Sequence, residues 1–199
     1  MNPPLSAVFL DRDGTLIEER HYLSESEEVV VFSGVAEAMR RLQDAGLVLF
    51  LVTNQSGVGR GYFTLADVTR VHERLIAELA PCKAPFRHVY IAPEAPDQPS
   101  LGRKPSPYFL LDARDRFGVD LGSSYFVGDK LIDLECGWNA GVRKCLLVRT
   151  GYGAEVERAG HARLLEATIV DDFPAAARWI LHDRPISAPL RSHERANPN

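Results

Sequence analysis

Two aspartates stand one residue apart near the start of the chain, directly after the apolar run of residues 7–10. Four apolar residues in succession predict a strand that is buried on both faces, as at the centre of a parallel sheet. The carboxylates of Asp11 and Asp13 would repel each other and resist full ionisation unless a cation or a donor lies between them. A bound divalent metal ion is the simplest solution, and Gly14 would let the Asp13 carbonyl turn back into the same site. The alternative is an ordinary turn, because Asp and Gly are common in turns.

Further polar side chains stand at corresponding places, either directly after a predicted strand or in the proline-rich loop of residues 93–107. They are Thr53, Asn54, Arg103, Lys104, Asp129 and Lys130. In a doubly wound parallel sheet, ligands bind outside the carboxyl ends of the strands. The sequence therefore predicts that these groups meet Asp11 and Asp13 in one pocket.

Apolar runs and helically spaced apolar residues alternate along the chain. Strands are expected at residues 7–10, 47–52, 88–92, 124–127, 144–148 and 168–170. Helices are expected at residues 34–46, 64–79, 107–117 and 173–181, and from residue 131 onward. This alternation predicts an α/β fold, a three-layer doubly wound parallel sheet with right-handed crossovers. Residues 17–33 are expected to form only a small flap or hairpin near the site, so a cap domain is minimal or absent. Leu75, Ile76 and Leu79 are expected in the core.

The chemistry of the predicted pocket follows from its oxygen ligands and its cationic side chains. Mg²⁺ prefers oxygen ligands and is usually held by one or two carboxylates together with a substrate phosphate. The chain has no HxxxH string or cysteine cluster for a zinc reaction centre, and no GxxxxGK[ST] string for a nucleotide phosphate loop. Asp11 is then the nucleophile that forms an aspartyl-phosphate, and Asp13 is the general acid and base. Thr53 and Lys104 would hold the oxygens of the transferring group.

The composition is that of an ordinary globular protein, with 45% hydrophobic and 25% charged residues in 199. A formal net charge of -4 argues against nucleic acid as the main partner. The start of the chain lacks the pattern of a signal peptide, and no apolar run approaches the roughly 20 residues of a membrane span. Three cysteines without CxxC spacing indicate reduced thiols in a cytoplasmic protein. We expect one domain, residues 1–184, and a disordered tail, residues 185–199.

Four short runs carry a resemblance to a known family: DRDGT, TNQSG, RKP and GDKLID. In this combination the chain resembles the phosphatases of the haloacid dehalogenase superfamily. The longer runs DRDGTLI, VTNQSGVGRGYFT, RKPSP, SSYFVGDKLIDLECGWNAGV and LLVRTGYG are similar to the heptose-bisphosphate 7-phosphatases and the related histidinol-phosphatases. The resemblance implies removal of the 7-phosphate of a manno-heptose 1,7-bisphosphate. It also implies Mg²⁺ held by Asp11, Asp129 and the carbonyl of Asp13, with Thr53 and Lys104 on the phosphoryl group.

The resemblance also implies a set of residues that contact the substrate. They are Glu19, Arg20, His21, Tyr22, Asn54, Gln55, Ser56, Arg103 and Lys130. Three roles stay open. Asp133 either supports the metal or Lys104 from behind or is only an exposed acid or a partner of the helix dipole. Arg60 contacts phosphate or only stabilises its own loop, and His21 contacts the substrate or is only a solvated loop histidine. The partner expected is a small phosphorylated sugar bound by a monomer, with neither nucleic acid nor membrane involved.

One departure from the family concerns the loop before Arg103. Many family members carry a structural zinc there, in a CxH…CxC pattern. The corresponding residues 92–94 and 100–102 contain neither Cys nor His. The sequence therefore predicts no structural zinc and a shorter, proline-stiffened loop. Because this loop helps to shape the pocket, the departure affects the substrate specificity that the resemblance implies, whereas the chemistry should carry over to this chain.

Other functions remain as alternatives. A histidinol-phosphate phosphatase and a polynucleotide 3′-phosphatase would use the same chemistry, although the net charge counts against the second. A phospho-accepting receiver or a degenerate binding scaffold is the alternative outside enzymes. A receiver does not need a second aspartate two residues after the first, so Asp13 favours turnover.

Overall fold

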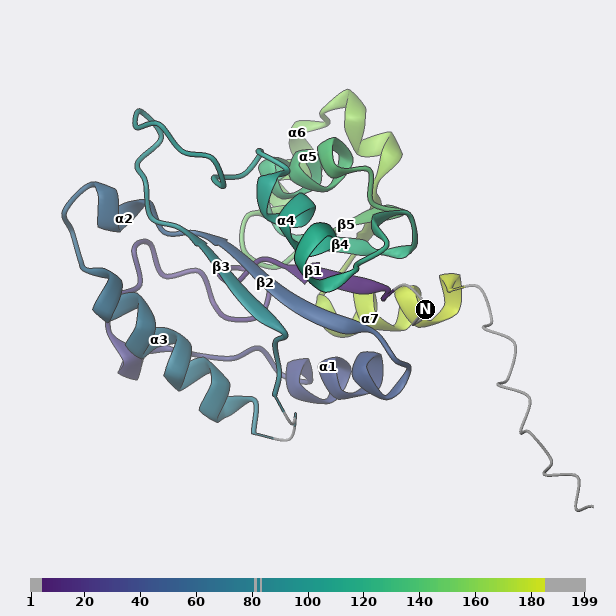
Figure 1. The fold of residues 1–199 in the computed structure, drawn as a ribbon, viewed down its shortest axis with the longest axis horizontal. Coiled ribbons are helices and arrows are strands. Elements are labelled where there is room, and N and C mark those ends of the chain that lie inside the picture. Colours follow the sequence, from purple (N-terminus) through teal and green to yellow (C-terminus); the bar gives the residue numbers. More distant parts are fainter. Residues whose placement is uncertain (1–4, 81, 83, 185–199) are drawn as a thin grey trace, which may run out of the picture.

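Six parallel strands in the order β3-β2-β1-β4-β5-β6 form the sheet of the computed structural model (Figure 1). The structure describes residues 5–80, 82 and 84–184. The strands are β1 (Ala7–Leu10), β2 (Val48–Asn54), β3 (His88–Ala92), β4 (Tyr125–Gly128), β5 (Lys144–Val148) and β6 (Thr168–Val170). The chain runs outward from β1 to β3, and then returns to the other side of β1 with β4, so the α/β doubly wound fold is confirmed. The expected tail, residues 185–199, lies outside the described residues.

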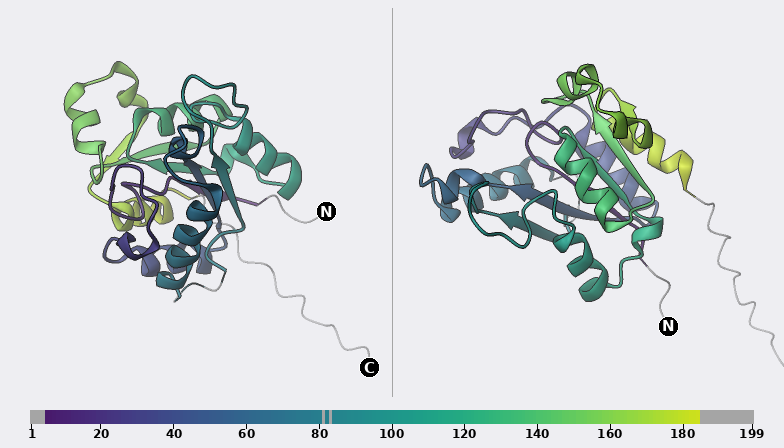
Figure 2. Two further views of the ribbon diagram at one scale, coloured as in Figure 1. Left: turned by 90° about the vertical axis from the view of Figure 1, so that its left-hand side faces the viewer. Right: turned by 90° about the horizontal axis from the view of Figure 1, so that it is seen from above.

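Helices cover both faces of the sheet, which gives the three expected layers (Figure 2). One face carries α1 (Val35–Asp44), α3 (Leu65–Glu78) and α7 (Phe173–Asp183). The opposite face carries α4 (Tyr108–Phe117) and α5 (Leu131–Ala140). Short elements fill the connections: α2 (Ser56–Gly59), α6 (Gly153–Ala159), and the 3-10 turns Ser26–Glu28, Leu121–Ser123 and Ala162–Glu166.

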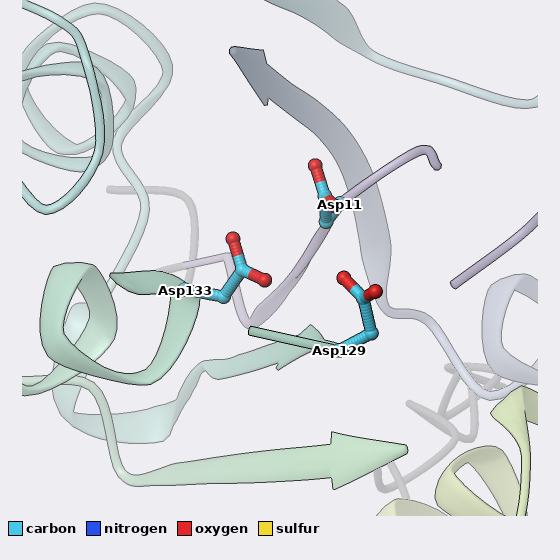
Figure 3. Close-up of side chains that lie close together, drawn as sticks. All are labelled: Asp11, Asp129 and Asp133. Carbon is cyan, nitrogen blue, oxygen red and sulfur yellow. The ribbon is translucent and has the colours of Figure 1, made fainter. Parts of the chain in front are cut away.

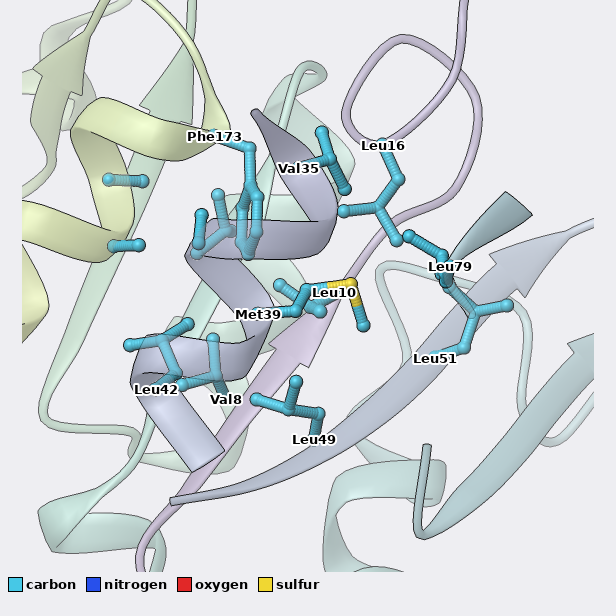
Figure 4. Close-up of a cluster of buried hydrophobic side chains, with 14 of the residues drawn as sticks. Val8, Leu10, Leu16, Val35, Met39, Leu42, Leu49, Leu51, Leu79 and Phe173 are labelled. Atoms are coloured by element: carbon cyan, nitrogen blue, oxygen red, sulfur yellow. The ribbon is translucent and has the colours of Figure 1, made fainter. Parts of the chain in front are cut away.

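Strand β1 is fully buried because both of its faces are covered. All four of its residues are 0% exposed. Val8 and Leu10 point into the core beneath α1 and α7, where Met39 and Phe173 pack against the sheet (Figure 4). Ala7 and Phe9 point into the second core. Because successive side chains of β1 enter two apolar cores, all four residues before the aspartates are apolar; a strand with one exposed face would alternate apolar and polar residues.

Most predicted elements are confirmed, with small shifts at their ends. The α3 helix begins after Thr64, whose hydroxyl accepts from the Asp67 backbone while the Asp67 carboxylate accepts from the Thr64 backbone in a capping box. Strand β2 extends to Asn54, two residues beyond its predicted end. The placement of Ile76 in the core was wrong, because Ile76 is 42% exposed. It follows buried Leu75 by about 100° around the helix and so points away from the sheet.

The segment between β1 and α1 is an irregular excursion and not a domain. It contains one 3-10 turn, which packs against α3, and isolated bridges that link Ile17 to Asp13 and to Val31. Within the described residues no separate cap domain stands over the sheet. No described helix combines the length and the apolarity needed to cross a bilayer.

Candidate active site

Three buried aspartates meet at the carboxyl ends of the central strands. Asp11 follows β1, Asp129 follows β4, and Asp133 lies in the first turn of α5. One carboxylate oxygen from each lies within 4.8 Å of the others, and the three groups face a common space (Figure 3). The parallel pairing of β1 with β4 brings the ends of these strands side by side. The last hydrogen bond between them runs from the Asp11 N–H to the Val127 carbonyl over 3.0 Å.

Two glycines allow neighbouring loops to approach Asp129 closely. Gly14 has φ +78°, and a Cβ atom there would lie 2.2 Å from Asp129 Oδ2. A Cβ atom at Gly151 would lie equally close, at 2.2 Å from the same oxygen. The turn that follows Asp13 therefore needs glycine both for its positive φ and for the space that Asp129 occupies.

Lys104 places a buried ammonium among the acids. Its Nζ lies 2.6 Å from Asp11 Oδ1 and 2.6 Å from Asp133 Oδ1. Burial alone would lower the pKa of Lys104, but the charges of the two carboxylates outweigh burial and raise it. Asn54 fixes the backbone of Lys104, because its side chain donates to the Lys104 carbonyl over 3.2 Å and accepts from the Lys104 N–H over 3.0 Å. Of the two alternatives for Asp133, the geometry places it in contact with Lys104.

The three clustered acids outnumber the ammonium of Lys104 among them. With all four groups ionised, they carry a formal charge of −2. Burial raises the pKa of Asp129, and the charges of Asp11 and Asp133 raise it further. Burial also raises the pKa of Asp11, against the opposing charge of Lys104. Asp129 Oδ1 is buried without any hydrogen-bond partner among the described residues. Such a group of oxygen ligands fits a divalent cation.

Asp13 is not one of the three clustered acids and has its own partners. Arg12 Nε and Nη2 donate to its carboxylate over 3.1 and 3.0 Å. Gln55 Nε2 donates to Asp13 Oδ2 over 3.1 Å and also to Thr53 Oγ1 over 2.8 Å. Arg12 is only 1% exposed, so a fully buried guanidinium holds Asp13 at the edge of the site. The carboxylate of Asp13 therefore lies outside the acid group, and a role as metal ligand is left to its backbone carbonyl.

A cavity of about 490 Å³ opens above these side chains. Among the predicted substrate residues, the following line it: Glu19, His21, Tyr22, Asn54, Gln55, Ser56, Arg103 and Lys130. Arg20 does not, because its side chain pairs with Glu18 at 2.6 Å on the surface. Thr53 and Asp129 are buried and also do not line the cavity.

Several wall residues were missed by the sequence analysis. They are Arg12, Leu23, Gly57, Phe63, Ile132 and Tyr152. A charged residue between the two aspartates was a usable signal for Arg12. Tyr152 lies after β5 in the run LLVRTGYG, which is similar to the family, but the sequence analysis gave it no role.

Two family models match overlapping parts of the chain. Residues 101–176 match the model described as HAD-hydrolase-like, and residues 6–132 match the model described as Polynucleotide kinase 3 phosphatase. With the sheet order and the acids at its carboxyl edge, these matches define the class. The fold and the site are those of a hydrolase of the haloacid dehalogenase superfamily.

Individual relatives assign the chain to a more specific family within this superfamily. The chain is 36% identical over 193 residues to the D-glycero-D-manno-heptose-1,7-bisphosphate 7-phosphatase of Chlorobaculum tepidum, covering 90% of this chain and 96% of that one. It is 39% identical over 158 residues to the D-glycero-beta-D-manno-heptose-1,7-bisphosphate 7-phosphatase of Escherichia coli K12, covering 76% and 83%. The crystal structure of D,D-heptose 1,7-bisphosphate phosphatase from B. bronchiseptica, complexed with magnesium and phosphate, matches with a TM-score of 0.81 and 30% identity over 89% of this chain and 99% of that one. The chain belongs to this family of phosphatases, and the resemblance predicted from the sequence is confirmed.

Proposed function

We propose that the protein removes the 7-phosphate of a D-glycero-D-manno-heptose 1,7-bisphosphate in a reaction that depends on Mg²⁺. The observation that carries the proposal is the acid group at the floor of a cavity whose wall includes Arg103 and Lys130. Relatives named for this activity cover most of the chain. Arg20, which pairs with Glu18 and does not line the cavity, is left out of the proposed substrate set.

The metal would be held by Asp11, Asp129 and the backbone carbonyl of Asp13. The formal charge of −2 and the unpartnered Oδ1 of Asp129 support a divalent ion at this place. When bound, Mg²⁺ would neutralise charge that develops on the phosphoryl oxygens. Asp133 supports the site indirectly, because it holds the Lys104 ammonium at 2.6 Å.

Asp11 is the proposed nucleophile. A carboxylate oxygen of Asp11 forms a bond to phosphorus while the bond from phosphorus to the substrate's 7-oxygen breaks, and an aspartyl-phosphate results. Asp13 donates a proton to the leaving oxygen. In the second half, Asp13 takes a proton from a water molecule that attacks phosphorus, and phosphate and the Asp11 carboxylate are released.

Lys104, which lines the cavity, and Thr53, which is buried beside it and does not line it, are proposed to hold the transferring oxygens. Lys104, already 2.6 Å from Asp11, supplies positive charge where the transition state carries negative charge. The Thr53 hydroxyl is fixed by Gln55, which also reaches Asp13 over 3.1 Å. Loss of one such donor typically costs about 10² to 10³ in rate.

The second phosphate of the substrate is proposed to bind near Arg103. Burial and then the charge of Arg60 lower the pKa of Arg103, so two guanidinium groups lie close enough to disfavour each other. An anion near Arg103 would relieve that repulsion. We propose that Arg60, whose role the sequence left open, adds to the positive charge near Arg103, although Arg60 does not line the cavity.

We also propose that the loop before Arg103 holds no structural zinc. Side chains hold its residues together: Ser100 Oγ donates to Glu94 over 2.8 Å, and Gln98 accepts from the Ala95 N–H over 2.8 Å. Arg103 in turn donates to the Glu94 carbonyl over 3.0 Å. These hydrogen bonds stabilise the loop without a metal ion. The loop also lacks the cysteine and histidine side chains that hold structural zinc.

A panel of phosphate esters tests the proposed function. Phosphate release is measured with and without Mg²⁺ from the α and β anomers of heptose 1,7-bisphosphate, histidinol phosphate and a 3′-phosphorylated oligonucleotide. We expect one heptose anomer to have the highest kcat/KM and the activity to disappear without Mg²⁺. The family model matched by residues 6–132 favours the oligonucleotide as the second candidate. Strong release from the oligonucleotide or histidinol phosphate, with negligible release from either heptose, would refute the substrate and leave the reaction class intact.

A further inference from the structure

A strap of residues 18–23 forms one side of the cavity mouth and adopts an unusual backbone conformation. His21 has φ +36° and Tyr22 has φ +58°, two consecutive side-chain-bearing residues in the left-handed region. Glu19, His21, Tyr22 and Leu23 all line the cavity. Residues other than glycine hold such angles where their surroundings fix them, so the contacts of the strap need to be identified.

Tyr152 supplies the contact at His21. Its hydroxyl lies 3.1 Å from His21 Nδ1, and the two rings are 6.1 Å apart between centroids. The backbone of Tyr152 is anchored to the catalytic floor, because its N–H donates to Asp129 Oδ2 over 2.9 Å. One residue therefore connects the floor of the site to the strap, across 131 positions of sequence.

The same ring also contacts the next side chain in the wall. Lys130 Nζ lies 4.7 Å from the centre of the Tyr152 ring, and donates to Glu19 of the strap over 2.8 Å. A cation over an aromatic face is attracted by the ring, so Tyr152 also limits where the Lys130 ammonium can lie. Tyr152 thus reaches the strap twice, directly through His21 and indirectly through Lys130 and Glu19.

Tyr62 lies against the far end of the strap. The rings of Tyr22 and Tyr62 meet edge to face with centroids 4.9 Å apart, and both side chains are largely exposed. Tyr62 follows α2, so the strap also contacts the segment that follows β2.

We propose that Tyr152 is a positioning residue that latches the strap over the cavity through His21 and so sets the fit of the substrate body. The inference rests on the proposed function for the identity of that body, a phosphorylated sugar. The reacting groups are held by separate contacts, Asp11 by Lys104 and Asp13 by Arg12. Loosening the strap should therefore weaken binding much more than it slows the chemical step.

Three variants test the latch by steady-state kinetics. Tyr152→Phe removes the hydroxyl and keeps the ring over Lys130, and His21→Gly removes the imidazole where glycine tolerates positive φ. We expect each to raise KM for the sugar bisphosphate about two- to tenfold, as loss of one hydrogen bond does, with kcat changed less than about twofold. The KM of the double variant should not exceed the higher KM of the two single variants, since both substitutions remove the same contact between Tyr152 and His21. The control is Tyr108→Phe, the same chemical change at an exposed position of α4.

Additive effects in the double variant would overturn the latch, and so would a fall in kcat with unchanged KM. Hydrogen exchange of residues 18–23 provides a readout that needs no substrate. Tyr152→Phe should accelerate exchange in the strap and leave exchange in β1 unchanged, whereas unchanged exchange in the strap would refute the proposal. If the heptose is not the substrate, exchange still reports the latch, so the two proposals fail separately.

Discussion

Asp11 and Asp13 are two residues apart, yet their carboxylates lie in different surroundings. Asp11 is buried against the Lys104 ammonium, whereas Asp13 is 16% exposed at its side chain and paired with Arg12. A nucleophile needs to be ionised beside the phosphoryl group, and a general acid and base needs access to the leaving group and to water. The two environments support the two different roles proposed for the pair.

Asp13→Asn should abolish turnover without unfolding the protein. An amide keeps the shape and can still bond to Gln55, but it cannot give or take the proton, so we expect kcat to fall by roughly 10² to 10⁴. Circular dichroism and thermal melting should match the wild type closely. The matched control is Asp115→Asn on α4, an exposed carboxylate paired with Arg114. Turnover near the wild-type rate in Asp13→Asn would refute the acid and base assignment.

Asp133→Asn tests whether the acid behind Lys104 matters. The substitution removes one of the two carboxylates that hold the Lys104 ammonium, and weakens the bond to the Lys130 N–H. Supporting groups of this kind typically contribute 10- to 100-fold, so we expect a loss of about that size in kcat/KM. Asp171→Asn, at a carboxylate that is 83% exposed, serves as the control. Equal kinetics in the two variants would mean that Asp133 is only a helix cap.

At the residue scale, the sequence predicted which residues lie at the edge of the sheet better than it predicted which side chains contact one another. Asp11 and Asp129 lie at one edge as expected because their places at strand ends follow from the pattern of apolar runs. The pairing of Arg12 with Asp13 and the contact between Tyr152 and His21 could not be predicted. Both depend on side-chain directions, and the second joins segments 131 positions apart.

At the scale of elements, an aromatic row stiffens the centre of the sheet. Phe9 on β1 is in register with Phe50 on β2 and Phe126 on β4, and its ring lies 5.3 and 6.4 Å from theirs. Cross-strand pairs of this kind stabilise neighbouring strands. Because Asp11 comes two residues after Phe9, the row also fixes the strand end on which the acids depend.

Phe9→Ala should be strongly destabilising. The side chain is 0% exposed, so its removal leaves a cavity in the core, and we expect the free energy of unfolding to fall by about 3–5 kcal/mol. Urea denaturation measures the change. Leu165→Ala, at a side chain that is 92% exposed, should change it by less than about 0.5 kcal/mol. A loss below about 1 kcal/mol in Phe9→Ala would show that the row is not a structural support.

The elements that the sequence missed are short. Strands β1, β2, β4 and β5 were predictable because nearly all of their residues are buried and form apolar runs, whereas β3 and β6 are partly exposed edge strands. The helices α2 and α6 have four and seven residues, too few for an apolar period to be recognisable. The extension of β2 to Asn54 was missed because polar residues at a strand end resemble the start of a loop.

At the scale of the whole molecule, two cores lie on the two faces of one sheet. Every described strand contributes to that sheet, and α7 packs against α1 across the chain's length. We propose that residues 1–184 form a single phosphatase domain, with no second unit required for the site.

The end of α7 is fastened to the sheet by a pH-sensitive contact. Arg143 Nε and the Tyr125 hydroxyl donate to Asp183 over 2.7 and 2.9 Å. The Arg143 hydrogen bond holds the pKa of Asp183 below its ordinary value. Because the folded pKa lies below the unfolded one, this contact stabilises the fold above about pH 4 and is lost as the pH falls through the lowered pKa.

Asp183→Asn should therefore destabilise the protein by about 1 kcal/mol at pH 7 and by less at pH 3. Urea denaturation of both proteins at the two pH values gives the difference. The partly exposed pair is screened by salt, so the measurement belongs at low ionic strength. An equal difference at both pH values would mean that packing, and not the charge of Asp183, accounts for the effect.

The transfer of the phosphoryl group to Asp11 is the central claim, and a rapid-quench experiment tests it most directly. The enzyme, with Mg²⁺, is mixed with a heptose 1,7-bisphosphate that carries labelled phosphorus at position 7, and acid stops the first turnover at successive times. We predict that the label appears transiently on the peptide that contains Asp11 and decays as free phosphate forms. Label on another residue, or free phosphate formed from the first time point with none on the protein, would contradict the account.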